Sequence, residues 1–195
     1  MNRLRFLTSE VVLGLLIAVF SIMTAVASYQ GALSDGDQSK ANLAGMTALT
    51  DDNAEYLTAN QVIIQDYTYF DTYYLNVDTN PEIAEYYQAS FSDALNSSME
   101  RESGPFDEAY YEEMYAGPNE YFEDADGKFA LGEKYNERGD QLQLVMMIMA
   151  VGLSFVAWAS LLPAESRMRL VFTILALITL VLGFITYLRV PVVAG

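Results

Sequence analysis

Three long apolar runs dominate the pattern of hydrophobic and polar positions along the chain. Val11 to Ser28, Leu142 to Leu162 and Leu170 to Leu188 contain 18, 21 and 19 residues, none of them charged. A helix needs roughly 20 apolar residues, at about 1.5 Å each, to cross about 30 Å of hydrocarbon. The pattern therefore predicts three transmembrane helices. Pro163 closes the second run, so the short segment up to Arg169 predicts a tight turn and an antiparallel hairpin.

Basic residues indicate how these helices are oriented. Arg3 and Arg5 precede the first run, and Arg167 and Arg169 lie in the short turn. Bases beside short loops stay on the cytoplasmic side. We therefore expect an integral protein of a bacterial inner or plasma membrane, with the N-terminus in the cytoplasm and residues 29–140 outside it.

A competing interpretation of the first run is a cleavable signal peptide. Arg3 and Arg5 would form its basic region, and Ala25-Val26-Ala27 has the small-x-small pattern of a cleavage site. Only two membrane spans would then remain in the mature chain.

A heptad-like pattern follows the first run. Positions spaced by four and three residues keep one phase through Ala32, Asp35, Ser39, Asn42, Met46, Leu49, Asn53, Tyr56, Asn60, Ile63, Tyr67, Phe70 and Tyr74. From Met46 onward this spacing is typical of a coiled-coil seam. The first helix would then extend far beyond the apolar run. Ser34-Asp35-Gly36-Asp37 could instead end one helix and cap the next, and the sequence leaves both alternatives open.

Shorter helices are predicted in the rest of the middle segment. Asn80-Pro81 suits a helix start after a turn, and the helix would run from Glu82 to about Met99. Ser103-Gly104-Pro105 would break the chain before a helix from Phe106 to Tyr115 that Gly117-Pro118 ends. Asn119 to Asp126 is expected to be a loop or a single turn, with helix again from Lys128. Alternation typical of strands is not sustained.

The expected fold is therefore an all-α membrane protein with three transmembrane helices and an acidic helical extramembrane bundle between the first and second. Its parts are residues 1–28 as a stub and first span, 29–140 as an acidic, Tyr-rich extracytoplasmic domain, and 141–195 as a transmembrane hairpin. Residues 29–140 hold 24 of the 26 acidic residues, five bases and 13 of the 14 tyrosines. Such a charge would repel nucleic acid.

The chain contains no Cys and no His. This excludes disulfides, thiolate nucleophiles, histidine ligands and the commonest general base. None of the three apolar runs has a charged interior residue of the kind that proton and ion paths use. We therefore expect no enzyme, no catalytic residues, no cofactor and no transport by this chain alone.

Residues 122–133 partly match the calcium-binding EF-hand loop. Asp124, Asp126, Gly127 and Glu133 fall at its positions three, five, six and twelve, although Phe122 stands where the first Asp ligand belongs. Asp124, Asp126 and Glu133 are therefore candidate calcium ligands, against the alternative of an ordinary acidic turn.

Small residues recur at helical spacing in each apolar run and are candidates for helix packing. They are Gly14, Ala18, Ser21 and Ala25 in the first run, Ala150, Ser154 and Ala157 in the second, and Gly183 in the third. Small side chains let two helix backbones approach closely in lipid. The strips would serve either the packing of this chain's own helices or the docking of a partner subunit.

The order of parts resembles small bacterial three-pass membrane proteins of unknown function. This resemblance is one of topology over the whole chain, and it implies no site and no activity. The expected function is a non-enzymatic accessory or scaffold subunit that contacts other membrane subunits, or a second copy of itself, through the small-residue strips and the external domain. The alternative is an extracytoplasmic sensor or binding module for cations, a basic protein or a small ligand.

Overall fold

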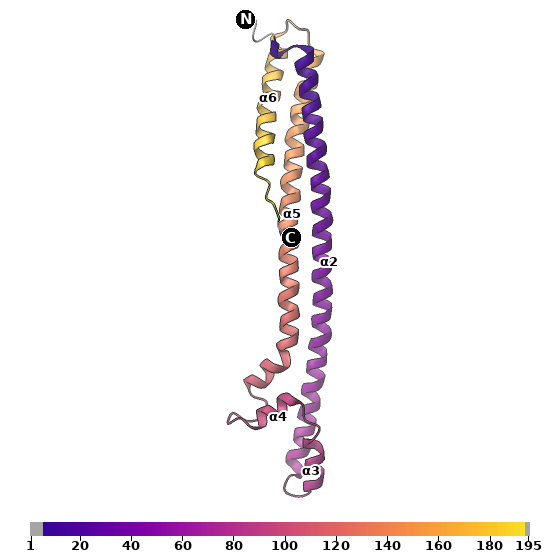
Figure 1. The fold of residues 1–195 in the computed structure, drawn as a ribbon, viewed down its shortest axis with the longest axis vertical. Coiled ribbons are helices and arrows are strands. Elements are labelled where there is room, and N and C mark those ends of the chain that lie inside the picture. The colour runs from indigo at the N-terminus through magenta and orange to yellow at the C-terminus, as the bar shows by residue number, and fades with distance from the viewer. Residues whose placement is uncertain (1–5, 194–195) are drawn as a thin grey trace. The chain divides into compact units, whose positions relative to one another are not determined.

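The computed structural model describes residues 6–193, and within them all regular secondary structure is helical. Helix α2 spans Glu10–Asn76, α3 Pro81–Gln88, α4 Asp93–Met99, α5 Glu108–Leu161 and α6 Arg167–Leu188 (Figure 1). Helices α2, α5 and α6 are each long and apolar enough to cross a membrane. The all-helical fold and the three membrane-length helices are thus confirmed. Arg3 and Arg5 lie outside the described residues, and the side of the membrane that each end occupies stays a prediction.

The chain forms two compact units. We call Met1–Ala41 with Ala130–Gly195 the terminal unit, and Asn42–Phe129 the central unit. Helices α2 and α5 contribute to both, because each is longer than its apolar run.

In the terminal unit, α2, α5 and α6 lie side by side around an apolar core (Figure 1). Buried members include Leu13, Leu16 and Phe20 of α2, with Leu142, Val145, Met149, Val156 and Ala159 of α5 and Ala176 of α6. Two glycines allow the helices to approach. A Cβ added at Gly152 would lie 2.2 Å from Phe20 Cε1, and one at Gly183 would lie 2.6 Å from Met149 Cε. At Gly152 glycine is needed because the ring of Phe20 fills the space, whereas at Gly183 a Cβ would displace the flexible end of Met149.

Helix α2 continues without a break through Ser34-Asp35-Gly36-Asp37, so the alternative of two helices is wrong. The Ser34 hydroxyl does not cap a new helix. It donates instead to the Tyr135 carbonyl of α5 at 3.0 Å, and Gln38 Nε2 donates to Asn136 Oδ1 at 3.2 Å. Ser34, which the sequence offered as a cap, therefore contacts α5 instead.

The heptad-like seam was predicted in the wrong phase over its first half. Ala32, Asp35 and Met46 are exposed, whereas the buried positions are Gly31, Ser34, Ala41, Gly45 and Ala48. The prediction followed the small residues of the first run, but α2 buries the neighbouring stripe that begins with Leu13 and Leu16. In the apolar run, lipid is as apolar as leucine, so shape fit against α5, rather than hydrophobicity, chooses the face. The buried stripe keeps the same phase beyond the apolar run. Ile63, which belongs to the predicted seam, is also buried, so the predicted and observed positions coincide there.

The helix predicted from Glu82 to Met99 is divided in two. Helix α3 ends at Gln88 and α4 starts at Asp93. Ser92 is the N-cap of α4, and its hydroxyl accepts a hydrogen bond from the Leu95 N–H. This local capping, together with contacts of Ser92 to α2, favours a break where apolar spacing alone favoured continuation.

The predicted stop at Gly117-Pro118 is also wrong, because α5 runs through it. Proline removes one backbone hydrogen bond and typically bends a helix without ending it. Figure 1 shows α5 changing direction near its N-terminal end. The following residues, predicted to be a loop, are helical as well, and Ala125 is buried on that stretch.

Candidate functional site

The segment that resembles a calcium loop is part of α5, so the predicted loop is not formed. An EF-hand needs twelve non-helical residues that wrap around the ion. On a helix, Asp126 and Glu133 point away from the face of Asp124, since successive residues turn by about 100°. Asp124 forms an ion pair with Lys128 one turn later. Among residues 6–193 no group of three or more acidic side chains is placed to hold a metal ion.

The small-residue strips have a different outcome in each helix. In α2, Gly14, Ala18, Ser21 and Ala25 are all exposed, and in α5 so are Ala150, Ser154 and Ala157. Gly183 of α6 is buried against Met149. Packing within the chain therefore uses Gly183 and leaves the other seven positions uncovered.

A buried carboxyl group organises the central unit, and sequence analysis missed it. Asp66 of α2 is 2% exposed and accepts three hydrogen bonds. The donors are the Ser92 N–H at 3.0 Å, the Ser92 hydroxyl at 2.5 Å and the Tyr110 hydroxyl at 2.9 Å. Its carboxyl group therefore joins α2 to the start of α4 and to α5. The sequence pattern that could have predicted this burial is the position of Asp66 on the same helix face as Ala59 and Ile63, which are both apolar.

The turn between α4 and α5 is fixed by a second acid, Asp107. Arg101 donates to it twice, from Nε at 2.7 Å and from Nη2 at 2.8 Å, and Ser103 Oγ donates at 2.6 Å. The bonds from Arg101 and then Ser103 hold the pKa of Asp107 well below its ordinary value. In the same turn Gly104 has φ 85° and Phe106 φ 63°. A positive φ is unfavourable for phenylalanine, so the surrounding contacts must hold it.

Phe106 is held by aromatic neighbours. Its ring stacks on Tyr67 at a centroid distance of 4.2 Å and meets Phe70 and Tyr110 edge to face at 5.5 and 5.1 Å. The Tyr67 and Tyr111 hydroxyls are hydrogen bonded to each other, and the Tyr115 hydroxyl donates to Asn60 Oδ1 at 3.0 Å. Tyrosine suits this core because a ring can be buried while its hydroxyl finds a partner.

Two of these tyrosines, Tyr110 and Tyr111, have strongly raised pKa values, and burial also raises the pKa of Tyr115. Burial, and then the hydrogen bond to Asp66, raises the pKa of Tyr110. The hydrogen bond with Tyr67, and then burial, raises the pKa of Tyr111 to about 12. Both effects favour the neutral hydroxyl in the folded protein.

We expect these two hydroxyls to make the central unit sensitive to alkali. Their folded pKa values exceed the ordinary value of 10.0. Their contribution to stability is therefore complete below pH 10. The part that comes from Tyr111 declines as the pH rises from 10 through 12, and the part from Tyr110 declines at higher pH. Thermal unfolding followed by near-ultraviolet circular dichroism should show this decline, and Tyr111→Phe should reduce it. Tyr74→Phe is the control, since that side chain is 68% exposed. Equal pH profiles for the two variants would contradict the assignment.

The central unit thus contains a connected set of aromatic contacts and hydrogen bonds whose donors and acceptors are paired within the unit. All three donors to Asp66 belong to the chain itself. This arrangement positions α4 and the start of α5 against α2, which is a structural role.

In the terminal unit a pocket of about 680 Å³ is lined by apolar side chains such as Val26 and Leu33 and by Asp37 and Arg138. The Arg138 guanidinium is engaged there, donating to the Pro191 carbonyl at 2.6 Å.

Together the fold and its contacts define an all-helical integral membrane protein with three membrane-length helices. No known family matches the chain, and no curated protein or solved structure is significantly similar to it.

Proposed function

We propose that this chain is a non-enzymatic accessory or scaffold subunit of a membrane assembly. The observation that carries the proposal is the exposure of the small-residue strips of α2 and α5, which take no part in the apolar core of the bundle. A strip of Gly, Ala and Ser lets a second helix approach closely in lipid, where van der Waals contact drives association. The partner is therefore another membrane helix, from a different subunit or from a second copy.

The proposal places the central unit in water, outside the cytoplasm. Residues 42–129 carry 19 acidic and two basic residues, and such charges are costly in hydrocarbon. Exposed Tyr86 and Ile83, 71% and 41% accessible, add contact surface for a partner. The acidic surface would steer a basic partner toward it, in a salt-dependent way.

A second candidate, a binding module, is favoured by one observation in the central unit. Glu82, Ile83, Tyr86 and Tyr87 of α3, with Thr72 and Asn76 of α2, line an open pocket of about 530 Å³. Mixed aromatic and polar walls are typical of small-ligand sites. A ligand taken up there should raise the unfolding temperature of the full-length chain, and Tyr86→Ala should abolish the rise.

The lateral contact is tested by photo-crosslinking in native membranes. A photoreactive residue in place of Ala18 is expected to form an adduct with a partner helix. The same residue at Leu15, which is 63% exposed on the same helix, should react mainly with lipid. Ala18→Leu should lower the amount of co-purified partner, because a large side chain there keeps the second helix from approaching closely. Leu15→Ala is the matched control. Adducts of equal yield from both positions would contradict the proposal.

A further inference from the structure

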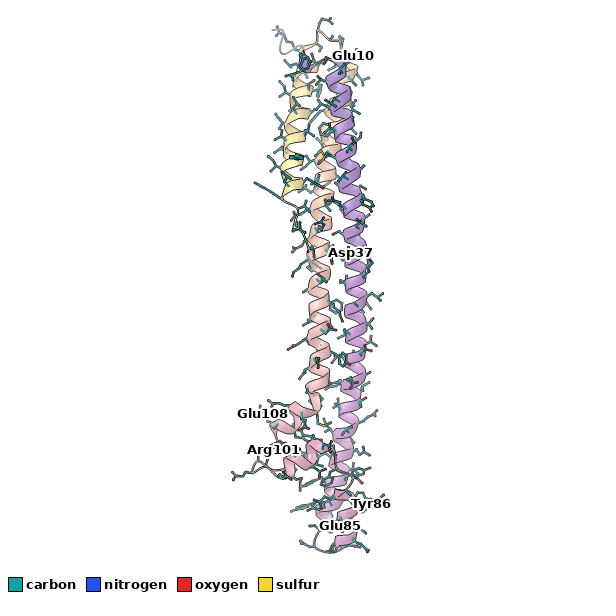
Figure 2. All side chains as sticks on the ribbon, in the orientation of Figure 1. Glu10, Asp37, Glu85, Tyr86, Arg101 and Glu108 are labelled. Atoms are coloured by element: carbon teal, nitrogen blue, oxygen red, sulfur yellow. The ribbon has the colours of Figure 1, made fainter. Side chains whose placement is uncertain are left out.

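At one end of the terminal unit, three chain segments surround a pocket of about 190 Å³. Its lining residues are Thr8, Ser9 and Glu10 at the start of α2, Ala164 and Glu165 of the turn between α5 and α6, and Arg169 of α6. Figure 2 shows Glu10 at the end of α2 that lies beside this turn. The apolar runs of all three helices end here, so in a bilayer the pocket lies at the depth of the lipid headgroups.

Arg169 is the unusual member of this lining. It is 4% exposed, and its Nη1 donates to the Leu162 carbonyl at 3.0 Å, beyond the end of α5. Its Nε is buried and has no hydrogen-bond partner among residues 6–193. A guanidinium offers five N–H donors, and a buried cation without a charged partner costs free energy. The natural complement of such a group is an oxyanion, above all a phosphate.

Helix termini add to the attraction for an anion. Helix α2 begins at Glu10 and α6 at Arg167, both beside the pocket. The first N–H groups of a helix lack intrahelical acceptors and carry partial positive charge. Within residues 6–193 the Ser9 hydroxyl accepts the Val12 N–H of α2, at 3.4 Å, and the Ser166 side chain makes no capping bond at α6. These termini support a ligand whose phosphate faces Arg169.

The same pocket also has two carboxyl groups on exposed residues, Glu10 and Glu165. They would repel a ligand that is only anionic, and they would attract an ammonium group. We propose that the pocket binds a phosphorylated primary amine, the phosphoethanolamine headgroup of a membrane lipid. Arg169 meets its phosphate, and Glu10 and Glu165 accept hydrogen bonds from its ammonium. A choline headgroup has no N–H to donate and fits the carboxylates less well. The proposal is independent of the accessory role.

The test uses the full-length chain in lipid nanodiscs. Phosphatidylcholine discs containing phosphatidylethanolamine are expected to raise the unfolding temperature above that in pure phosphatidylcholine, and native mass spectrometry should find the ethanolamine lipid retained. Arg169→Gln should lower that retention about tenfold or more, as expected for loss of a charged hydrogen bond of about 1.5 to 3 kcal/mol. The matched control is Arg167→Gln, an exposed base in the same turn of α6 that does not line the pocket. Equal retention by the two variants overturns the proposal.

Glu165→Gln provides an independent readout, because this side chain is exposed and its replacement is isosteric. It should shift the preference of the pocket from phosphatidylethanolamine to anionic phosphatidylglycerol, and an unchanged preference overturns the role of the carboxylates. This variant decides the matter if Arg169→Gln fails to fold. Free phosphoethanolamine added to phosphatidylcholine discs distinguishes a lipid headgroup from a soluble ligand. A rise in unfolding temperature on adding it supports a soluble ligand of the same chemistry. Equal protection by inorganic phosphate overturns recognition of the amine.

Discussion

Replacing Asp66 with alanine is expected to destabilise the central unit by about 3 kcal/mol or more, because the buried Tyr110 hydroxyl and the half-buried Ser92 N–H both lose their acceptor. The Ser92 N–H and the Tyr110 hydroxyl both donate to Asp66, and Tyr110 is fully buried. The Tyr110 hydroxyl cannot reach water without opening the contact between α2 and α5. The loss should appear as faster hydrogen exchange in peptides covering residues 91–110, measured on the full-length chain by mass spectrometry.

The matched control for this prediction is Asp71→Ala. Asp71 lies on the same helix, is exposed and carries the same charge, so its removal should change stability by less than about 0.5 kcal/mol. Tyr110→Phe should cost about 1 to 2 kcal/mol by itself. Both variants remove the same hydrogen bond, the one between the Tyr110 hydroxyl and Asp66. The free-energy cost of the double variant should therefore be less than the sum of the costs of the two single variants. Strict additivity, or an exchange pattern for Asp66→Ala like that of Asp71→Ala, would show that Asp66 does not hold these helices together.

The second large effect is expected at Gly152. A Cβ there would lie 2.2 Å from Phe20 Cε1 and 2.6 Å from Thr179 Oγ1, side chains of the two other helices of the terminal unit. Phe20 is fully buried and has little room to rotate away. Gly152→Ala should therefore cost about 1 to 3 kcal/mol through overpacking, despite the better helix propensity of alanine. Circular dichroism during denaturation in detergent micelles measures this loss.

Gly14→Ala is the control for Gly152, because a Cβ added there meets nothing within 4 Å. It should leave the isolated chain at least as stable as before. Phe20→Leu combined with Gly152→Ala should recover a substantial part of the lost stability, since the smaller side chain vacates the space that the new methyl group needs. Gly152→Ala and Gly14→Ala variants of equal stability would falsify the close contact between α2, α5 and α6.

The contrast between these two glycines explains where sequence analysis of the membrane helices succeeded and failed. Charge-free runs of about 20 residues identify spans because charge is costly in hydrocarbon, whatever the packing. Which face of a span is buried follows a weaker rule, because lipid offers no hydrophobic reward for burying one face over another. Gly14 and Gly152 look alike in sequence, yet only Gly152 receives a phenylalanine ring from a neighbouring helix.

In the central unit the errors have a similar origin. Gly117-Pro118 and the acidic stretch after it are locally typical of a turn and a loop, but α5 continues through both. Local preferences of a few kcal/mol are overcome where a helix gains packing along its length, and buried Ala125 lies on that face. The break before α4 shows the opposite case. The Ser92 hydroxyl caps α4 by accepting the Leu95 N–H, and it donates to Asp66, 26 positions earlier in the chain.

By itself, the sequence determined the properties that depend on one segment and its solvent: helical character, three membrane-length runs, and the concentration of acid in the middle of the chain. Only the tertiary structure decided which faces pack and that Asp66 is buried with partners from two other helices. It also decided that Arg169 lines a pocket with its Nε donor unpaired among residues 6–193. The physical reason is that the cost of exposing a run to lipid or water adds up along the chain. The partners of a buried side chain are set instead by residues far away in sequence.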